Sequence, residues 1–171
     1  MIIQVQAGLP PRAGRAGVRI ALMLAVCIAV GCSSPVERRM GETFNVGAFS
    51  YTVKDKEVRN RISFGDSPME AGRGATFILV RYQVVNHGKD YAQVNPLLLR
   101  LETADHTIYS VDLPATYALR MPSALKNDPS GGGLLPAGGS GSYIAAFRVP
   151  DDVARRKLNL VIRGRTVVPI D

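Results

Sequence analysis

A run of twelve residues, Ala75–Asn86 (ATFILVRYQVVN), constrains the fold of this chain more than any other part of its sequence. Its side chains alternate between two faces, an apolar one with Ile78, Val80, Tyr82 and Val84 and a mixed one with Phe77, Leu79, Arg81 and Gln83. A period of two is typical of a β-strand, whereas a helix repeats every 3.6 residues. The segment Asn86–Lys89 (NHGK) then supplies a turn. We therefore expect a long β-strand over Ala75–Asn86.

The same period recurs along the chain. Phe49, Tyr51 and Val53 alternate with polar residues, and further strands are predicted over Leu97–Thr103, Thr107–Val111, Ser140–Val149, Lys157–Arg163 and Thr166–Ile170. Helix is expected only as a turn or two near Asp151–Arg156 and near Pro122–Lys126. About seven to eight strands with so little helix favour an all-β, immunoglobulin-like antiparallel β-sandwich, and a closed β-barrel is the alternative.

The first part of the chain has a different character. Met1–Arg19 carries arginines and no acidic residue, and an apolar run follows over Ile20–Gly31. This run of about a dozen residues is too short for the roughly 30 Å of bilayer hydrocarbon, but it fits the apolar core of an export signal. We interpret residues 1–31 as a cleaved signal peptide.

The end of that run, Ile28–Ser34 (IAVGCSS), resembles the lipobox of bacterial lipoproteins, although Ala29 stands where leucine is usual. The resemblance implies cleavage before Cys32 and acylation of its thiol, with palmitate among the acyl chains. It predicts a lipidated tether over residues 32–41, a domain over 42–171 and an extracytoplasmic, membrane-held protein. Ser33 after the cysteine favours the outer membrane if the host is Gram-negative. An ordinary secretory signal with an incidental cysteine is the alternative.

Cysteine and charge content limit what the mature chain can do. The only cysteines are Cys27 and Cys32, so the domain has no thiol for a disulfide, a metal site or a nucleophile. Removing residues 1–31 removes three arginines and lowers the formal charge from +7 to +4. This modest charge does not predict a nucleic-acid partner.

Several stretches resemble the immunoglobulin-like family catalogued as domain of unknown function 4352: Phe44–Gly47, Phe77–Asn86 ending in asparagine, Leu99–Tyr109, and Leu135–Ser140 leading to Ala146–Pro150. His106 departs from the pattern, because the family's hairpin turn often has glycine there. The family has no agreed activity, so the resemblance implies a fold and a cell-envelope location but no chemistry.

Motifs for catalysis are weak. The glycine-rich stretches Gly131–Gly133 and Gly138–Ser142 lack the Gly-Lys-Ser/Thr ending of a phosphate-binding loop. Ser140 lacks the closing glycine of a nucleophile elbow, and its only candidate bases, His87 and His106, lie in predicted turns. We predict no catalytic residue, no cofactor and no enzymatic activity.

Two further sets of residues were weighed as binding sites. An exported copper carrier could use as ligands His87, His106, Met69 and Met121. None of these residues lies at close ligand spacing, so no metal site is predicted. Arg155–Lys157 with Arg163 and Arg165 could contact anionic lipid, and a solvated sheet edge is the alternative that we favour.

The segment Asp112–Gly133 is the first candidate for a partner contact. It is long for a loop and carries apolar residues between prolines, including Tyr117, Leu119 and Met121. It is either a lid that closes one end of the sandwich or a surface for an envelope protein or small molecule. The sequence thus predicts a lipid-anchored, non-catalytic interaction domain, with a carrier of a small molecule or metal ion as the alternative.

Overall fold

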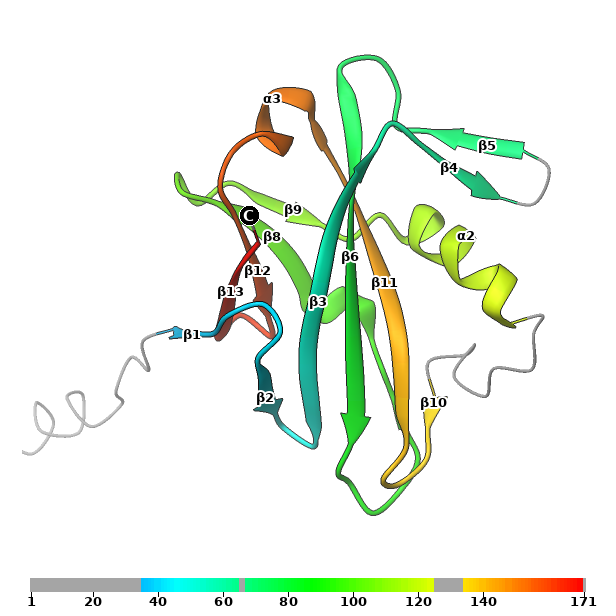
Figure 1. Ribbon diagram of the computed structural model, residues 1–171, viewed down its shortest axis with the longest axis vertical. Coiled ribbons are helices and arrows are strands. Elements are labelled where there is room, and N and C mark those ends of the chain that lie inside the picture. Colours follow the sequence, from blue (N-terminus) through cyan, green and yellow to red (C-terminus); the bar gives the residue numbers. More distant parts are fainter. Residues whose placement is uncertain (1–34, 65–66, 125–133, 171) are drawn as a thin grey trace, which may run out of the picture. The chain divides into compact units, whose positions relative to one another are not determined.

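Three long antiparallel strands run side by side through the computed structural model, which describes residues 35–64, 67–124 and 134–170 (Figure 1). They are β3 (Phe49–Arg59), β6 (Ala75–Asn86) and β11 (Ser140–Pro150). The short β2 (Thr43–Val46) extends this sheet to the order β11-β6-β3-β2. The predicted strand Ala75–Asn86 is confirmed over its whole length, because both of its edges are paired.

A second sheet has the order β1-β13-β12-β8-β9. Its strands are β1 (Val36–Glu37), β8 (Leu99–Thr103), β9 (Ile108–Ser110), β12 (Leu158–Ile162) and β13 (Thr166–Ile170). All pairs are antiparallel except β1 with β13. The last four strands agree with the sequence prediction to within two residues at each end.

The main core lies between the two sheets. It includes the predicted apolar face of β6, since Ile78, Val80, Tyr82 and Val84 are at most 1% exposed. An aromatic row crosses the four strands of the first sheet, in the order Phe44, Tyr51, Tyr82 and Tyr143. Successive rings stack with centroids 5.7–6.3 Å apart, which fills the thickness between the sheets. The all-β sandwich is therefore confirmed.

The outer face of the four-stranded sheet is also partly buried. Phe77 and Leu79 on β6 are 0% and 2% exposed, and they belong to a second apolar cluster with Ala115 and Ala118. This cluster is covered by α2 (Leu113–Ala124) and by the hairpin of β4 (Arg61–Phe64) and β5 (Ser67–Glu70) (Figure 1). The mixed face of the alternating run is thus a second packing face.

The helix α2 corrects the prediction that Asp112–Gly133 is a loop, because Leu113–Ala124 are helical. Asp112 caps the helix, because its Oδ1 accepts from the amide of Ala115 at 3.0 Å. Pro114 lies in the first turn, where an amide proton is not required and the residue is compatible with helix. Pro122 lies in the last turn, where it cannot donate to the carbonyl four residues before it, so the helix loses this bond close to its end.

The remaining elements are short. The predicted helical turn after Pro150 is confirmed as α3 (Asp151–Ala154). The second predicted turn, near Pro122–Lys126, overlaps the end of α2, and residues 125–133 lie outside the described part. A 3-10 turn η1 (Pro96–Leu98) precedes β8, and β7 (Ala92–Gln93) pairs with β10 (Leu134–Leu135).

The segment expected to be a tether, residues 32–41, is folded in part. Val36–Glu37 form β1 along the otherwise unpaired edge of β13, and the amide of Arg38 donates to the carbonyl of Val167 at 2.8 Å. These bonds satisfy backbone groups that an open sheet edge would leave free. Cys32 lies outside the described residues. Within the described part of the chain, no helix is both long and apolar enough to cross a bilayer.

Candidate functional site

The helix α2 carries the three residues predicted to contact a partner. Tyr117 is 54% exposed, although its neighbours Thr116 and Ala118 are 0% and 1% exposed. Leu119 is half-buried against the second apolar cluster. Met121 belongs to the helix, but its side chain lies outside the described part. The structure thus separates Tyr117, which faces outward, from Leu119, which takes part in packing.

Polar contacts fix α2 to the sheet beneath it. The hydroxyl of Thr116 accepts from the amide of Ala146 on β11 at 2.9 Å, and this contact is buried. Asp112 also pairs with Arg148 of β11 at 3.0 Å, and the Arg148 guanidinium lies over the ring of Phe77, 5.2 Å from its centroid. The exposure of Tyr117 therefore does not come from a loosely held helix.

The histidines considered as metal ligands do not converge. His87 follows β6 at the end of the sandwich where Asn86 pairs with Phe49. His106 lies in the β8–β9 turn at the opposite end, beside the start of β12, and its Nδ1 is 2.6 Å from Glu102. Met69 is packed in the second apolar cluster. Among the described residues, no three histidine, cysteine, aspartate or glutamate side chains lie close enough together to hold a metal ion.

Sequence analysis missed one Ser–His contact. Nε2 of His87 lies 2.5 Å from Oγ of Ser50, which donates to Oδ1 of Asn45 at 2.7 Å. The single hydroxyl proton of Ser50 is used in the bond to Asn45, so Nε2 of His87 must donate to Ser50. This polarity is opposite to that of a general base and its nucleophile. Ser50 and His87 are far apart in the sequence and belong to no recognisable motif, so the sequence did not indicate their contact.

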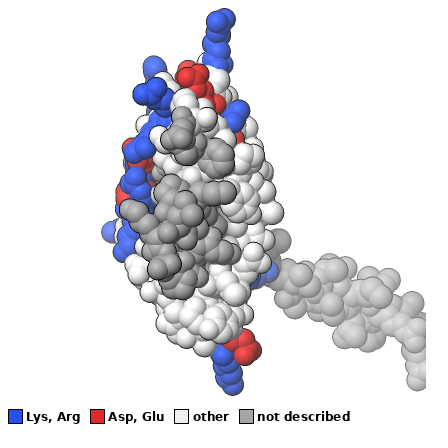
Figure 2. All heavy atoms as spheres, turned by 90° about the vertical axis from the view of Figure 1, so that its right-hand side faces the viewer, with Lys and Arg blue, Asp and Glu red and all other residues white. Residues whose placement is uncertain are grey.

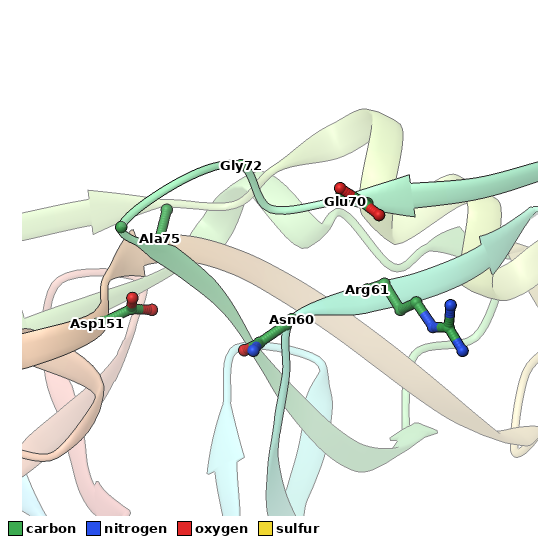
Figure 3. A pocket seen from close by; sticks show the side chains of 7 residues that line it. Asn60, Arg61, Glu70, Gly72, Ala75 and Asp151 are labelled. Carbon is green, nitrogen blue, oxygen red and sulfur yellow. The ribbon is translucent and has the colours of Figure 1, made fainter.

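Two adjoining pockets lie at the end of the sandwich near α3, where Figure 3 shows the first of them. The first has a volume of about 280 Å³ and is lined mainly by Asn60, Arg61, Glu70, Asp151 and the backbone around Gly72. In Figure 3 the Asn60 and Asp151 side chains point into the same space, whereas the Arg61 guanidinium points away from them. Open and polar, this site suits a small charged molecule more than an apolar one.

A row of opposite charges covers the exposed part of the four-stranded sheet. Arg81 on β6 pairs with Asp55 at 2.8 Å and with Glu57 at 2.6 Å, and Arg59 also pairs with Glu57 at 2.5 Å. Hydrogen bonding from Arg59, supported by Arg81, lowers the pKa of the Glu57 carboxyl. These groups are exposed and mutually paired, which is typical of a solvated sheet face rather than of acid–base catalysis.

The basic residues that were weighed as one patch fall into two groups. Arg155–Lys157 precede β12 and Arg163 follows it, so the strand Leu158–Ile162 separates them. At about 3.3 Å per residue, a strand of this length places the two groups at opposite ends of the sandwich. The five residues therefore do not form one patch, which agrees with the preference for a solvated sheet edge, and Arg163 and Arg165 belong to the end that also holds Val36.

The fold recurs in solved structures of low sequence identity. A conserved hypothetical protein from Bacillus anthracis matches with a TM-score of 0.65 and 15% identity, over 78% of this chain and 94% of its own. An uncharacterized β-sandwich protein from Clostridium difficile matches with a TM-score of 0.56 and 15% identity, over 82% and 97%. The secreted protein MPT63 from Mycobacterium tuberculosis matches with a TM-score of 0.53 and 14% identity, over 81% and 98%.

None of the curated proteins matches this chain. A family model does match, over residues 39–164, and it spans both sheets from the approach to β2 to the turn after β12. These limits include all four stretches that resemble the family in sequence. The chain accordingly belongs to the DUF4352 family, a domain of unknown function.

Proposed function

We propose that this chain is a bacterial lipoprotein, acylated at Cys32 and held on the extracytoplasmic side of a membrane, whose sandwich domain binds another envelope protein without catalysis. The anchor is supported by the lipobox-like residues around Cys32 and by the apolar run before them. A Gram-negative host would place the protein at the outer membrane, given Ser33. Two or three acyl chains anchor a protein stably, because each buried CH₂ contributes about 0.8 kcal/mol.

The single observation that carries the binding role is the outward-facing Tyr117 on a firmly packed helix. Lys, Arg, Asp and Glu side chains gather mostly along one margin and at the two ends of the α2-bearing face in Figure 2, and much of the described surface between them is uncharged. An exposed aromatic residue on a firmly packed element is typical of the residues that anchor protein–protein contacts. The partner would be an envelope protein that offers a pocket to Tyr117.

The anchor is tested by Cys32→Ser in the full chain. Loss of fatty-acid labelling and release of the protein from the membrane fraction are expected, because the thiol is the proposed point of attachment. Cys27→Ser is the matched control, since Cys27 lies within the predicted signal peptide and its loss should leave both readouts unchanged. Labelling that persists in Cys32→Ser would contradict the anchor.

The binding role is tested by a photo-crosslinking amino acid at position 117 in living cells. Ile108, which is 49% exposed and lies on β9 of the other sheet, is the matched control position. A defined protein crosslinked from position 117 and not from position 108 is expected. Equal capture from both positions, or none from position 117, would remove α2 as the contact.

A second candidate, a carrier of a small polar molecule, is favoured by the pocket beside Asn60 and Asp151. Native mass spectrometry of protein purified without chelators would detect such a cargo as a discrete added mass. Asp151→Asn should weaken its retention if the carboxylate binds it. If every preparation showed only the mass of the protein without cargo, the carrier role would be contradicted and the α2 contact would be the better proposal.

A further inference from the structure

The end of the sandwich at which the described chain begins carries an exposed basic turn. The amide of Val36 donates to the carbonyl of Arg165 at 2.9 Å, so β1 starts beside the turn between β12 and β13. Arg163 and Arg165 in this turn are both exposed. Neither forms an ion pair with an acidic side chain among the described residues, whereas Arg81 and Arg148, on the four-stranded sheet, do.

Apolar side chains border this turn. The amide of Arg163 donates to the carbonyl of Leu98 at 2.8 Å, which places η1 next to the turn, and Leu97 of η1 is 59% exposed. Val36 itself is 48% exposed. The turn therefore combines cationic and apolar side chains over a short stretch of surface.

The same end continues across to the four-stranded sheet. A Cβ atom at Gly47 would lie 3.0 Å from Nη1 of Arg163, and the neighbouring Ala48 accepts from the amide of His87 at 2.8 Å. Lys89 and Tyr91 follow His87 in the loop after β6, and Tyr91 is 69% exposed. We call the set Val36, Lys89, Tyr91, Leu97, Arg163 and Arg165 the tether-end surface. Its acidic neighbours are Glu37 and Asp90.

We propose that the tether-end surface lies against the anionic headgroups of the membrane to which Cys32 is attached, a role that rests on the lipid anchor proposed above. Cys32 precedes Val36 by four residues, and four residues reach at most about 14 Å. The Debye length at physiological ionic strength is about 8 Å, so the charge of an anionic leaflet acts on this end of the domain whenever the link is not fully extended.

The residue types match that occupant. Basic side chains near an anionic leaflet are attracted to it, and aromatic side chains collect at the headgroup level because one part of them is apolar and the other polar. Tyr91 and Leu97 would enter this interface while Arg163, Arg165 and Lys89 contact phosphates. In this orientation α3 and the β8–β9 turn, at the other end of the sandwich, point away from the bilayer (Figure 1).

The chain contains no tryptophan, so one introduced tryptophan is a unique fluorophore. The test uses the lipidated full chain with Leu97→Trp in vesicles of phosphatidylcholine and phosphatidylglycerol that contain brominated acyl chains. We expect at least twofold stronger quenching of this tryptophan than of one introduced by Ile108→Trp, a 49% exposed position at the opposite end. Equal quenching at the two positions would overturn the proposal.

The charges are tested in the same vesicles by Arg163→Asn combined with Arg165→Gln in the Leu97→Trp chain. Asparagine accommodates the left-handed backbone at position 163, where φ is 51°. Quenching at position 97 should fall by at least half, and it should also fall when phosphatidylcholine is the only lipid. Quenching that stays the same after both changes would overturn the role of the arginines.

Flotation of the vesicles separates this proposal from the anchor on which it rests. Protein that floats with vesicles but shows no preferential quenching at position 97 would retain the anchor and refute the docked orientation. Protein that does not float with either kind of vesicle would refute the anchor itself.

Discussion

Arg163 reaches from the turn between β12 and β13 to Gly47 in the turn between β2 and β3, and thereby links the two sheets at one end of the sandwich. Both residues have left-handed backbone, with φ values of 51° and 64°. The positive charge of Arg163 also acts on Tyr51 in the core, where it opposes the rise in pKa that burial causes. One side chain thus contributes to the closure of this end and to the electrostatics of the aromatic row.

Gly47→Ala is expected to destabilise the domain more than Gly41→Ala. Both positions have positive φ, which costs a residue with a side chain roughly 1–2 kcal/mol, but an added Cβ meets Arg163 only at Gly47 and meets nothing within 4 Å at Gly41. Urea unfolding of the two variants measures the difference. Equal losses would show that Arg163 moves aside without cost.

Asn86 is fully buried and joins three segments through its side chain. Its Nδ2 donates to the carbonyls of Asp90 at 2.8 Å and Leu135 at 3.0 Å, and its Oδ1 accepts from the amide of Gly88 at 2.8 Å. Asn86→Asp would place a carboxylate against these carbonyl oxygens. We expect a loss of roughly 3–5 kcal/mol in the free energy of unfolding at neutral pH, because the charge is buried and unpaired.

The loss in Asn86→Asp should shrink as the pH falls. Burial and the nearby carbonyl oxygens raise the pKa of a carboxyl at this position, and its protonated form regains a donor. Asn95→Asp is the matched control, since the exposed Asn95 caps η1 as an acceptor and a carboxylate preserves that role. Unfolding curves at neutral and acidic pH would contradict the expectation if both variants behaved alike.

Neighbouring positions of α2 should respond in opposite ways to substitution. Ala118 is 1% exposed and lies on the face of α2 that packs against the sheet. Ala118→Leu therefore overfills the second apolar cluster and should lower the free energy of unfolding by about 1–3 kcal/mol. Tyr117→Ala removes an exposed ring and should change stability by no more than about 0.5 kcal/mol. Thermal or urea unfolding checks both. A large loss in Tyr117→Ala would mean that the ring is structural.

Stability should decline in alkali partly because of Tyr51. Burial raises the pKa of its hydroxyl above the ordinary value of 10.0, with Arg163 opposing the rise. Above that ordinary value the unfolded chain loses the proton first, so the free energy of unfolding falls until the folded-state hydroxyl also ionises. Tyr51→Phe should flatten this decline, as measured by urea unfolding from neutral pH to pH 11. An unchanged slope would exclude Tyr51 as its source.

Sequence alternation alone predicted most of the two sheets. The strands β6, β8, β9, β11, β12 and β13 lie where a period of two predicted them. The terminal Asn86 of the family-like motif is the residue that ties the adjoining loops together. These features are local, because the strand period and residues that end a strand, such as Pro150, act on neighbouring positions. The departure at His106 was also visible, and the structure places it at a φ of 63°, where glycine is less strained.

The sequence by itself determined the position of most strands, the resemblance to the family and the lipobox-like segment, since each depends on residues adjacent in the chain. Tertiary structure decided the helix α2, because small residues such as Ala115 and Ala118 gain stability only when a sheet face lies beneath them. Tertiary structure also places Arg163 and Arg165 beside Val36, at the opposite end of the sandwich from Arg155–Lys157. Such groupings depend on strand direction and sheet order, which bring together residues distant in sequence and which local patterns do not encode.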